Sequence, residues 1–189
     1  MGGREAGVTL IELMVTLTVF GILTMLALPA FSTWLANTRI RTAAEAVSNG
    51  LHLARTEAVR RNANIQIELG ATGSTWTVSV VSSGEVLHAR SVEEGTANTR
   101  VTVTPGASRI VTFDSLGRVT ANTGGTAAIT EVKVDTLLFA DSEQRKLCVV
   151  IRPAGVARMC DPAVPATDTR RCHEVPAGGG AALVPAGCV

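Results

Sequence analysis

The stretch from Val8 to Leu28 is apolar apart from one charged residue, Glu12, and it constrains this chain more than any other feature. A helix rises ~1.5 Å per residue, so a run of this length spans ~30 Å, about the hydrocarbon thickness of a bilayer. An ionisable residue inside such a segment costs a few kcal/mol, so Glu12 is expected to have a partner and a function. The run is therefore predicted to be a membrane-spanning helix, preceded by a short leader at 1–7.

An ordinary secretory signal is the alternative interpretation of this segment. Secretory signals have an apolar core of roughly 7–15 residues that ends at a small-residue cleavage site, and positions 27–30 resemble such a site weakly. The present run is longer, and its one acidic residue lies at its beginning. A secretory signal or signal anchor leaves Gly7 and Glu12 without a role, so a membrane helix in which both residues have a function is favoured.

Helical periodicity continues beyond Pro29, where a bend is expected. Apolar residues recur at spacings of three and four along one face, which indicates an amphipathic helix ending near Arg61. These residues are Ile40, Ala44, Val47, Leu51, Ala54 and Ala58. The whole helix is predicted over residues 8–61, and its second half needs a sheet to cover its apolar face.

That sheet is predicted from short segments in which apolar and polar residues alternate between clusters of Gly, Ser, Asn and Pro. Strands are expected at 65–69, 75–80, 85–90, 100–104, 109–113, 117–120, 129–135 and 146–151. One long helix packed on short antiparallel strands makes an α+β domain. The segment 161–189 is rich in Pro, Ala and Gly, and is expected to be an irregular tail held by its cysteines.

All of the cysteines lie late in the chain, at Cys148, Cys160, Cys172 and Cys188. No two of them form a CxxC pair, which argues against a zinc ribbon. An even number of cysteines behind a membrane segment indicates disulfides in an oxidising compartment. Several connectivities are open. The pairing expected is Cys148–Cys160 with Cys172–Cys188, because each bond then closes a short local loop.

Composition gives no sign of a catalytic or cofactor site. The net charge of +1 provides no global attraction to nucleic acid. The sequence has no Gly-x-Ser-x-Gly elbow, and its histidines are scattered without further ligands at metal-binding spacing. We therefore predict no enzymatic activity, no bound metal and no cofactor.

The N-terminal residues resemble the class III signal of the type IV pilin superfamily, which has a glycine before the cleaved bond, an apolar residue after it and a glutamate at the fifth position. Here these are Gly7, Val8 and Glu12, and Pro29 matches the proline that bends the helix in that family. The resemblance implies cleavage after Gly7 and N-methylation of Val8 by a prepilin peptidase. It also implies that Glu12 pairs with the new amino group of Val8, in its own or a neighbouring subunit, so Glu12 and Pro29 are expected assembly residues.

Three further segments resemble the minor pilins and pseudopilins of FimT/GspH type. They are the helix end at 53–62, the F-D-x-x-G-like hairpin at 111–119 and the terminal hairpin at 147–160. The resemblance implies a leader at 1–7, a transmembrane segment at 8–29 and a periplasmic pilin-like domain at 30–160, in a single-pass protein of the inner membrane. It also implies packing against other pilins through the N-terminal helix.

In FimT-like members a G-R-x-R element on the terminal hairpin contributes to DNA binding. The matching positions here are Gly155, Val156, Ala157 and Arg158, so valine replaces the first arginine. Candidate phosphate contacts are Arg118, Arg152 and Arg158 near the hairpins, with Arg170 and Arg171 in the tail. Few aromatic residues are available for base stacking, so solvated surface arginines are the favoured interpretation.

Three functions are compatible with these features. The leading hypothesis is a minor type IV pilin that helps to start or cap a pilus and supports twitching, adhesion or DNA uptake. The second is a GspH-like pseudopilin of a type II secretion system, which differs from the first in its partners. The third is a DNA-binding receptor at the pilus tip.

Overall fold

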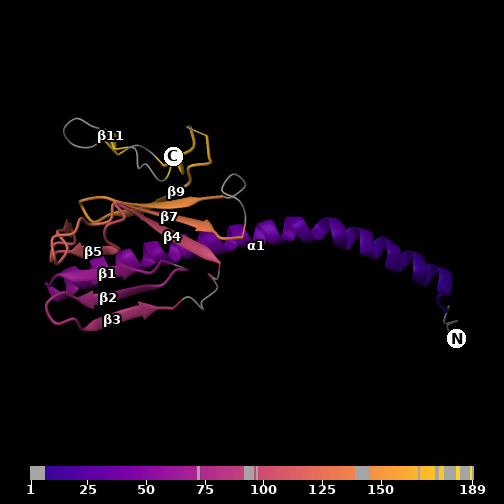
Figure 1. Ribbon diagram of the computed structural model, residues 1–189, viewed down its shortest axis with the longest axis horizontal. Helices are drawn as coiled ribbons and strands as arrows, with labels where there is room; N and C mark the ends of the chain where they lie inside the picture. The colour runs from indigo at the N-terminus through magenta and orange to yellow at the C-terminus, as the bar shows by residue number, and fades with distance from the viewer. Residues whose placement is uncertain are drawn as a thin grey trace, which may run out of the picture. The chain divides into compact units, whose positions relative to one another are not determined.

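The computed structural model describes residues 7–71, 73–91, 96, 98–138, 145–165, 167–172, 175, 176, 182, 183 and 188. The chain divides into two compact units, Met1–Ala36 and Asn37–Val189, and each is described by itself. Helix α1 (Leu10–Arg61) is continuous and contributes to both units (Figure 1). The strands are β1 (Ile65–Leu69), β2 (Trp76–Val80), β3 (Val86–Arg90), β4 (Thr99–Thr104), β5 (Ile110–Phe113), β6 (Val119–Thr120), β7 (Glu131–Thr136), β8 (Leu147–Ile151), β9 (Ala157–Cys160), β10 (Val175–Pro176) and β11 (Ala182–Leu183).

In the first unit, the apolar part of α1 is exposed: Leu10 is 79% exposed and Phe20 is 68% exposed. By length and composition, α1 is the one helix among the described residues that could cross a membrane. The hydroxyl of Thr24 donates a hydrogen bond of 2.8 Å to the carbonyl of Phe20. This bond satisfies the hydroxyl within the helix, as an apolar medium requires. The helix continues through Pro29, whose carbonyl accepts a 2.8 Å hydrogen bond from the hydroxyl of Ser32.

The helix begins at Leu10, two residues later than expected, because Thr9 acts as its N-cap. The hydroxyl oxygen of Thr9 accepts a hydrogen bond of 3.3 Å from the Glu12 N–H, and its carbonyl accepts one of 3.2 Å from Leu13. Threonine is a favoured N-cap residue, and a glutamate three residues later completes the sequence of a capping box. The negative charge of Glu12 in the first turn also suits the helix dipole. The helix thus begins two residues after the expected start near Val8.

In the second unit, the apolar face of α1 is buried as predicted from its periodicity. Each of the six residues on that face is 0–1% exposed: Ile40, Ala44, Val47, Leu51, Ala54 and Ala58. They belong to one hydrophobic core with residues of both large sheets, including Ile67 and Val149. The indole N–H of Trp76 donates a hydrogen bond of 3.1 Å to the carbonyl of Ala46, which fixes β2 against the helix.

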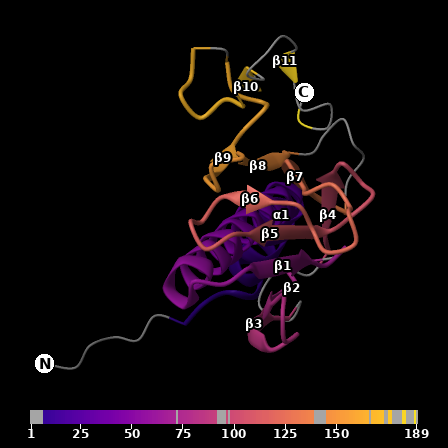
Figure 2. The ribbon, with the colours of Figure 1, turned by 90° about the vertical axis from the view of Figure 1, so that its left-hand side faces the viewer.

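Two antiparallel sheets cover the helix in this unit (Figures 1 and 2). The five-stranded sheet has the order β3-β2-β1-β5-β6, and the four-stranded sheet has the order β4-β7-β8-β9. The bounds of the expected strands are confirmed to within two residues. The largest differences are at the starts of β6, at Val119 rather than 117, and of β7, at Glu131 rather than 129. The predicted α+β class is confirmed.

Alternation along β7 and β8 gives the four-stranded sheet two different faces. Val132 and Val149 face the hydrophobic core and are 0% exposed. On the other face, the register places Cys148 opposite Cys160 and Glu131 opposite Val150. The first two cysteines therefore lie side by side on the face that is turned away from the core.

The disulfides differ from the expected pairing. Cys148 is bonded to Cys188, and Cys160 is bonded to Cys172. The expected bonds close short loops, but loop-closure entropy grows only with the logarithm of loop length, so it discriminates weakly between pairings. Cys148 and Cys160 lie side by side on one face of the sheet, and each is bonded to one cysteine of the tail. This arrangement, rather than loop length, determines the disulfide pairing. The described part of the tail is also less irregular than expected, since β10 and β11 form an antiparallel pair.

Peptide mapping without reduction is expected to show this connectivity. Trypsin leaves Cys148 in the peptide 147–158 and Cys160 in 159–170, whereas Cys172 and Cys188 share the peptide that follows Arg171. Additional cleavage after Glu174 separates the last two cysteines. Mass spectrometry should then find 147–158 joined to the peptide with Cys188, and 159–170 joined to the peptide with Cys172. A direct link between 147–158 and 159–170 would contradict this pairing.

Candidate functional site

The N-terminal segment presents an accessible bond beside an unpartnered carboxylate. Gly7 and Val8 precede the helix, and Val8 is 70% exposed. Nothing lies within 4 Å of the position that a Cβ atom on Gly7 would occupy. Within the described residues, the side chain of Glu12 has no hydrogen bond or ion pair. A carboxylate in an apolar helix therefore has no neutralising group in its own described chain, and it requires one from outside.

The five candidate phosphate-binding arginines have different environments. The guanidinium of Arg118 is paired with Asp114 at 2.8 Å, and that of Arg170 with Asp168 at 2.6 Å. Arg158 donates to the carbonyl of Thr169 at 2.9 Å, and Arg171 to that of Val164 at 3.0 Å. The exposed Arg152 alone has no side-chain partner in the described part of the chain. Four of the five are thus engaged by the protein itself.

The turn between β5 and β6 is organised by Asp114. One oxygen of its carboxylate accepts the N–H groups of Leu116 at 3.0 Å and Arg118 at 2.8 Å, and the other accepts the Arg118 guanidinium. These donors, the Arg118 backbone N–H above all, lower the pKa of Asp114 below its usual value. Arg118 therefore has a structural role in this turn, in addition to any role at the surface.

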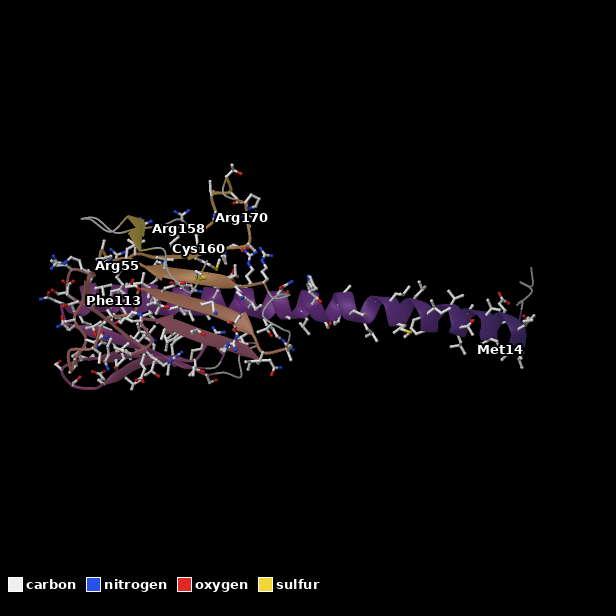
Figure 3. The ribbon with its side chains drawn as sticks, turned by 45° about the horizontal axis from the view of Figure 1, so that its top comes forward. Met14, Arg55, Phe113, Arg158, Cys160 and Arg170 are labelled. Carbon is white, nitrogen blue, oxygen red and sulfur yellow. A yellow bond between two sulfur atoms is a disulfide. The ribbon has the colours of Figure 1, made fainter. Side chains whose placement is uncertain are left out.

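The β5–β6 turn is packed against the β8–β9 turn in what we call the turn junction, formed by Arg55, Gly117 and Gly155. The Val119 N–H donates to the carbonyl of Pro153 at 2.9 Å, and the Arg55 Nε donates to the carbonyl of Gly117 at 3.0 Å. Gly117 and Gly155 have φ angles of 75° and 78°, in the region that favours glycine. Figure 3 labels Arg55 on α1 together with Phe113, the last residue of β5.

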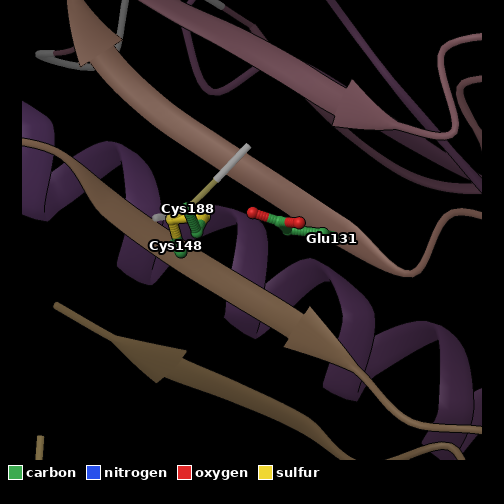
Figure 4. Close-up of side chains that lie close together, drawn as sticks. All are labelled: Glu131, Cys148 and Cys188. Atoms are coloured by element: carbon green, nitrogen blue, oxygen red, sulfur yellow. A yellow bond between two sulfur atoms is a disulfide. The ribbon is translucent and has the colours of Figure 1, made fainter. Parts of the chain in front are cut away.

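A buried carboxylate lies beside the Cys148–Cys188 disulfide. Glu131 is 1% exposed, and among the residues that the structure describes neither of its carboxylate oxygens has a hydrogen-bond partner. Its ligand atom lies within 4.8 Å of the sulfurs of Cys148 and Cys188 (Figure 4). Two thiolates and a carboxylate are ligands that suit zinc, but these sulfurs are bonded to each other, so they are not thiolates. Burial raises the pKa of Glu131, although the charge of Lys133 opposes this shift.

Replacing this carboxylate with an apolar side chain is expected to stabilise the second unit. Glu131→Leu should raise the free energy of unfolding at pH 7 by about 1–2 kcal/mol, because a buried polar group without partners costs an amount of this order. The folded-state pKa of Glu131 is raised, so wild-type stability falls as pH rises from the unfolded-state pKa through the folded-state value. The gain should therefore be smallest at low pH, where Glu131 is protonated in both states.

Urea unfolding at several pH values measures this effect. Glu131→Gln is the control, because it removes the titration but keeps a polar side chain at the same place. Both variants should lose the wild-type dependence on pH in this range, and only Glu131→Leu should gain the full stability. A Glu131→Leu variant that is less stable than wild type at pH 7 would mean that the carboxylate has a partner that matters for folding.

Sequence reasoning missed the ion pairs that fix the helix end and the β4 edge. Glu57 is 7% exposed and accepts hydrogen bonds from Arg60 at 2.6 Å and Arg61 at 2.9 Å, which lower its pKa to about 2. The i+3 and i+4 spacing could have shown this. Arg100 pairs with the fully buried Asp135 at 2.9 Å across β4 and β7. That contact depends on strand register, so no local pattern could have shown it.

Comparison with known proteins identifies two regions of the chain. The family model described as Type II transport protein GspH matches residues 43–155, and the prokaryotic N-terminal methylation motif matches residues 3–28. Two crystal structures of the type IV minor pilin FimU from Pseudomonas aeruginosa are similar. One is 21% identical, with a TM-score of 0.43 over 63% of this chain and 90% of that chain. The other is 19% identical, with a TM-score of 0.43 over 66% and 89%. No curated protein matches.

Proposed function

We propose that this chain, which belongs to the family of Type II transport protein GspH, is a minor type IV pilin that helps to start or cap a filament. The family consists of structural pilins and pseudopilins. In this proposal the chain is a single-pass protein of the inner membrane whose second unit lies in the periplasm. A prepilin peptidase cuts it after Gly7 and methylates Val8, and other pilins then pack against its N-terminal helix.

The observation that supports this proposal most strongly is the combination of an exposed apolar helix with one unpartnered carboxylate. The methylation motif covers residues 3–28, and Glu12 is the only charged residue between Val8 and Leu28. Cleavage after Gly7 creates an amino group four residues before Glu12. In a helical bundle of pilins, the new amino group on Val8 of a neighbouring subunit neutralises Glu12. The helices of other subunits cover the apolar surface.

A pseudopilin of a type II secretion system is the second candidate. It is favoured by the description of the matching family model, which names type II transport. The physical requirements of the N-terminal helix are the same in both filaments, so the two candidates differ only in the subunits that surround the chain. A DNA-binding receptor is not proposed, because Val156 stands where the DNA-binding element has its first arginine and few aromatic residues are available for base stacking.

Processing is the first test of the proposal. Mass spectrometry of the membrane-extracted protein should find a mature chain that begins with N-methylated Val8. Gly7→Val should block cleavage, because a side chain at this position hinders the close approach of a peptidase. Gly21→Val is the matched control: it adds the same side chain to the helix where a Cβ meets nothing within 4 Å, and cleavage should persist. A mature terminus near Ala30 would instead identify a secretory signal.

Cross-linking of the full chain in its own cell separates the two filaments. Photo-reactive side chains placed at exposed helix positions such as Met14 and Met25 should capture neighbouring subunits. Capture of type IV pilins would support the first candidate, and capture of secretion pseudopilins would support the second. A chain that is processed but captures no subunit of either filament would contradict both.

A further inference from the structure

A small pocket in the second unit is lined by three arginines. Its volume is about 140 Å³, several times the roughly 10–15 Å³ that a single ordered water requires. The lining residues come from α1, the residues just before β8, β8 itself, β9 and the segment that follows β9: Asn37, Arg41, Arg145, Leu147, Met159, Cys160, Asp161 and Arg170. We call this the arginine pocket. All of its residues belong to the second unit.

We propose that the arginine pocket binds the phosphate group of an anionic phospholipid headgroup. Nothing in the family match or in the methylation motif assigns a ligand to these residues. The phosphate part of the proposal stands on the pocket alone. The lipid as its source rests on the proposed function, because that function places the second unit next to a membrane surface before assembly.

Among the residues that line the pocket, arginines outnumber carboxylates. Asp161 is the only carboxylate among the lining residues, and it is 4% exposed. One of its oxygens accepts two hydrogen bonds from Arg145, at 3.1 and 2.7 Å, and the other accepts the Ala163 N–H at 2.9 Å. The Asp161 carboxylate is therefore already satisfied by Arg145 and the backbone. Arg41 and Arg170 remain as the positive groups that an incoming anion would meet.

Arg41 and Arg170 are held in place by carboxylates that do not line the pocket. Arg41 donates from its Nε to Glu45 at 2.8 Å, and Arg170 donates from its Nη2 to Asp168 at 2.6 Å. In the described residues, the Nη1 group of each arginine has no partner. A guanidinium presents five N–H donors in a planar fork, so each of these arginines can bind a phosphate oxygen and keep its carboxylate.

The remaining lining favours a ligand with an apolar part. Leu147, Met159 and Cys160 contribute carbon and sulfur surface beside the guanidinium groups. Figure 3 labels Cys160 and Arg170, which bring this mixed surface together from β9 and from the chain beyond it. A free inorganic anion makes no use of an apolar wall. A phosphodiester that is attached to glycerol does, because its carbon atoms leave water when they enter the pocket.

The position of the pocket along the chain favours a lipid as the source of this phosphate. Asn37, the first lining residue, follows Pro29 by only eight positions, and Pro29 ends the expected membrane segment. Eight residues span at most about 28 Å even when fully extended. This short connection allows the arginine pocket to reach the headgroups, where anionic lipids attract basic residues.

Lipid titration of the purified full chain in detergent tests the proposal. Native mass spectrometry should show that wild type retains phosphatidylglycerol more strongly than phosphatidylcholine, whose headgroup carries a compensating cation. Arg41→Gln and Arg170→Gln should each weaken phosphatidylglycerol binding about fivefold or more, because each removes a charge-assisted hydrogen-bond donor. Arg145→Gln is avoided, since it would leave the buried Asp161 without its main partner.

Arg60→Gln is the matched control for Arg41→Gln. Both arginines lie on α1, pair with a nearby glutamate and are largely exposed, at 60% and 71% of the side chain. Arg60 does not line the pocket, so its replacement should leave lipid retention unchanged. If Arg41→Gln and Arg60→Gln lose phosphatidylglycerol binding equally, the effect is due to general surface charge and the proposal is overturned. Thermal unfolding of each variant confirms that the fold is kept.

Inorganic phosphate serves as the second probe and separates the two sources of the anion. Binding of inorganic phosphate that depends on Arg41 and Arg170, without any preference for phosphatidylglycerol, would overturn the lipid assignment in favour of a free-anion site. These measurements do not depend on filament assembly. A chain that binds lipid through the arginine pocket but is never processed at Gly7 would contradict the proposed function and leave the pocket assignment intact.

Discussion

Gly155→Ala is expected to lower the free energy of unfolding of the second unit by about 3–5 kcal/mol, which is enough to unfold a marginally stable domain. A Cβ atom on Gly155 would lie far inside 3.0 Å of the Gly117 carbonyl oxygen. Backbone of the β5–β6 turn occupies that space, so relief requires the two turns to separate. The φ of 78° at Gly155 adds about 1 kcal/mol for any residue with a side chain.

The consequences of this clash extend beyond one turn. The same Gly117 carbonyl accepts the hydrogen bond from Arg55 of α1, so moving it also loosens the helix from the junction. Separation of the turns would further break the bond of 2.9 Å from the Val119 N–H to the Pro153 carbonyl. Helix α1, the β5–β6 turn and the β8–β9 turn are distant in sequence and meet at the turn junction, so the clash at Gly155 affects all three.

Gly84→Ala is the control that isolates the backbone contribution. Gly84 has a φ of 70°, close to that of Gly155, but nothing lies within 4 Å of the position of its Cβ. Its replacement should cost about 1 kcal/mol only. Urea unfolding followed by the fluorescence of Trp76, which is 9% exposed in the core, measures both variants. Similar losses for Gly84→Ala and Gly155→Ala would show that the turn junction contributes little.

Features that depend on local periodicity were predictable from the sequence. The buried face of α1 follows from spacings of three and four between Ile40 and Ala58, because such positions share one side of a helix wherever it packs. The strand bounds follow from alternation and turn residues in the same way. The helix start has a local signal too, because Thr9 and Glu12 have the sequence of a capping box, but Thr9 lies within the apolar run and the run alone does not show where the helix begins.

Features that depend on strand register were not predictable. The disulfide pairing rests on Cys148 lying opposite Cys160 with the tail over that face, and neither fact is encoded in cysteine spacing. The burial of Glu131 has the same origin, since its position in β7 turns it toward the disulfide rather than toward solvent. For the arginines, a local signal existed: Asp114 lies four residues before Arg118, and Asp168 lies two before Arg170.

Glu12→Ala is expected to be processed normally but to enter filaments at least about tenfold less than wild type. Cleavage depends on the accessible bond between Gly7 and Val8, which this substitution leaves unchanged. In the proposed filament the methylated amino group of Val8 lies in apolar surroundings, and it loses its counter-charge when the carboxylate is absent. An unpaired charge in a membrane-like medium costs a few kcal/mol, and each 1.4 kcal/mol is a factor of ten in an equilibrium.

Two further variants separate charge from helix capping. Glu12→Gln keeps the size of the side chain and removes the charge, so it should assemble as poorly as Glu12→Ala. Thr9→Ala removes the N-cap hydroxyl that accepts the Glu12 N–H, but keeps the carboxylate. It should cost only about 1 kcal/mol of local helix stability and assemble nearly as well as wild type. Quantitative immunoblots of sheared filaments, normalised to the processed chain in the membrane, give the ratio. If Glu12→Gln assembles like wild type, the ion pair with Val8 is not what admits this chain to a filament.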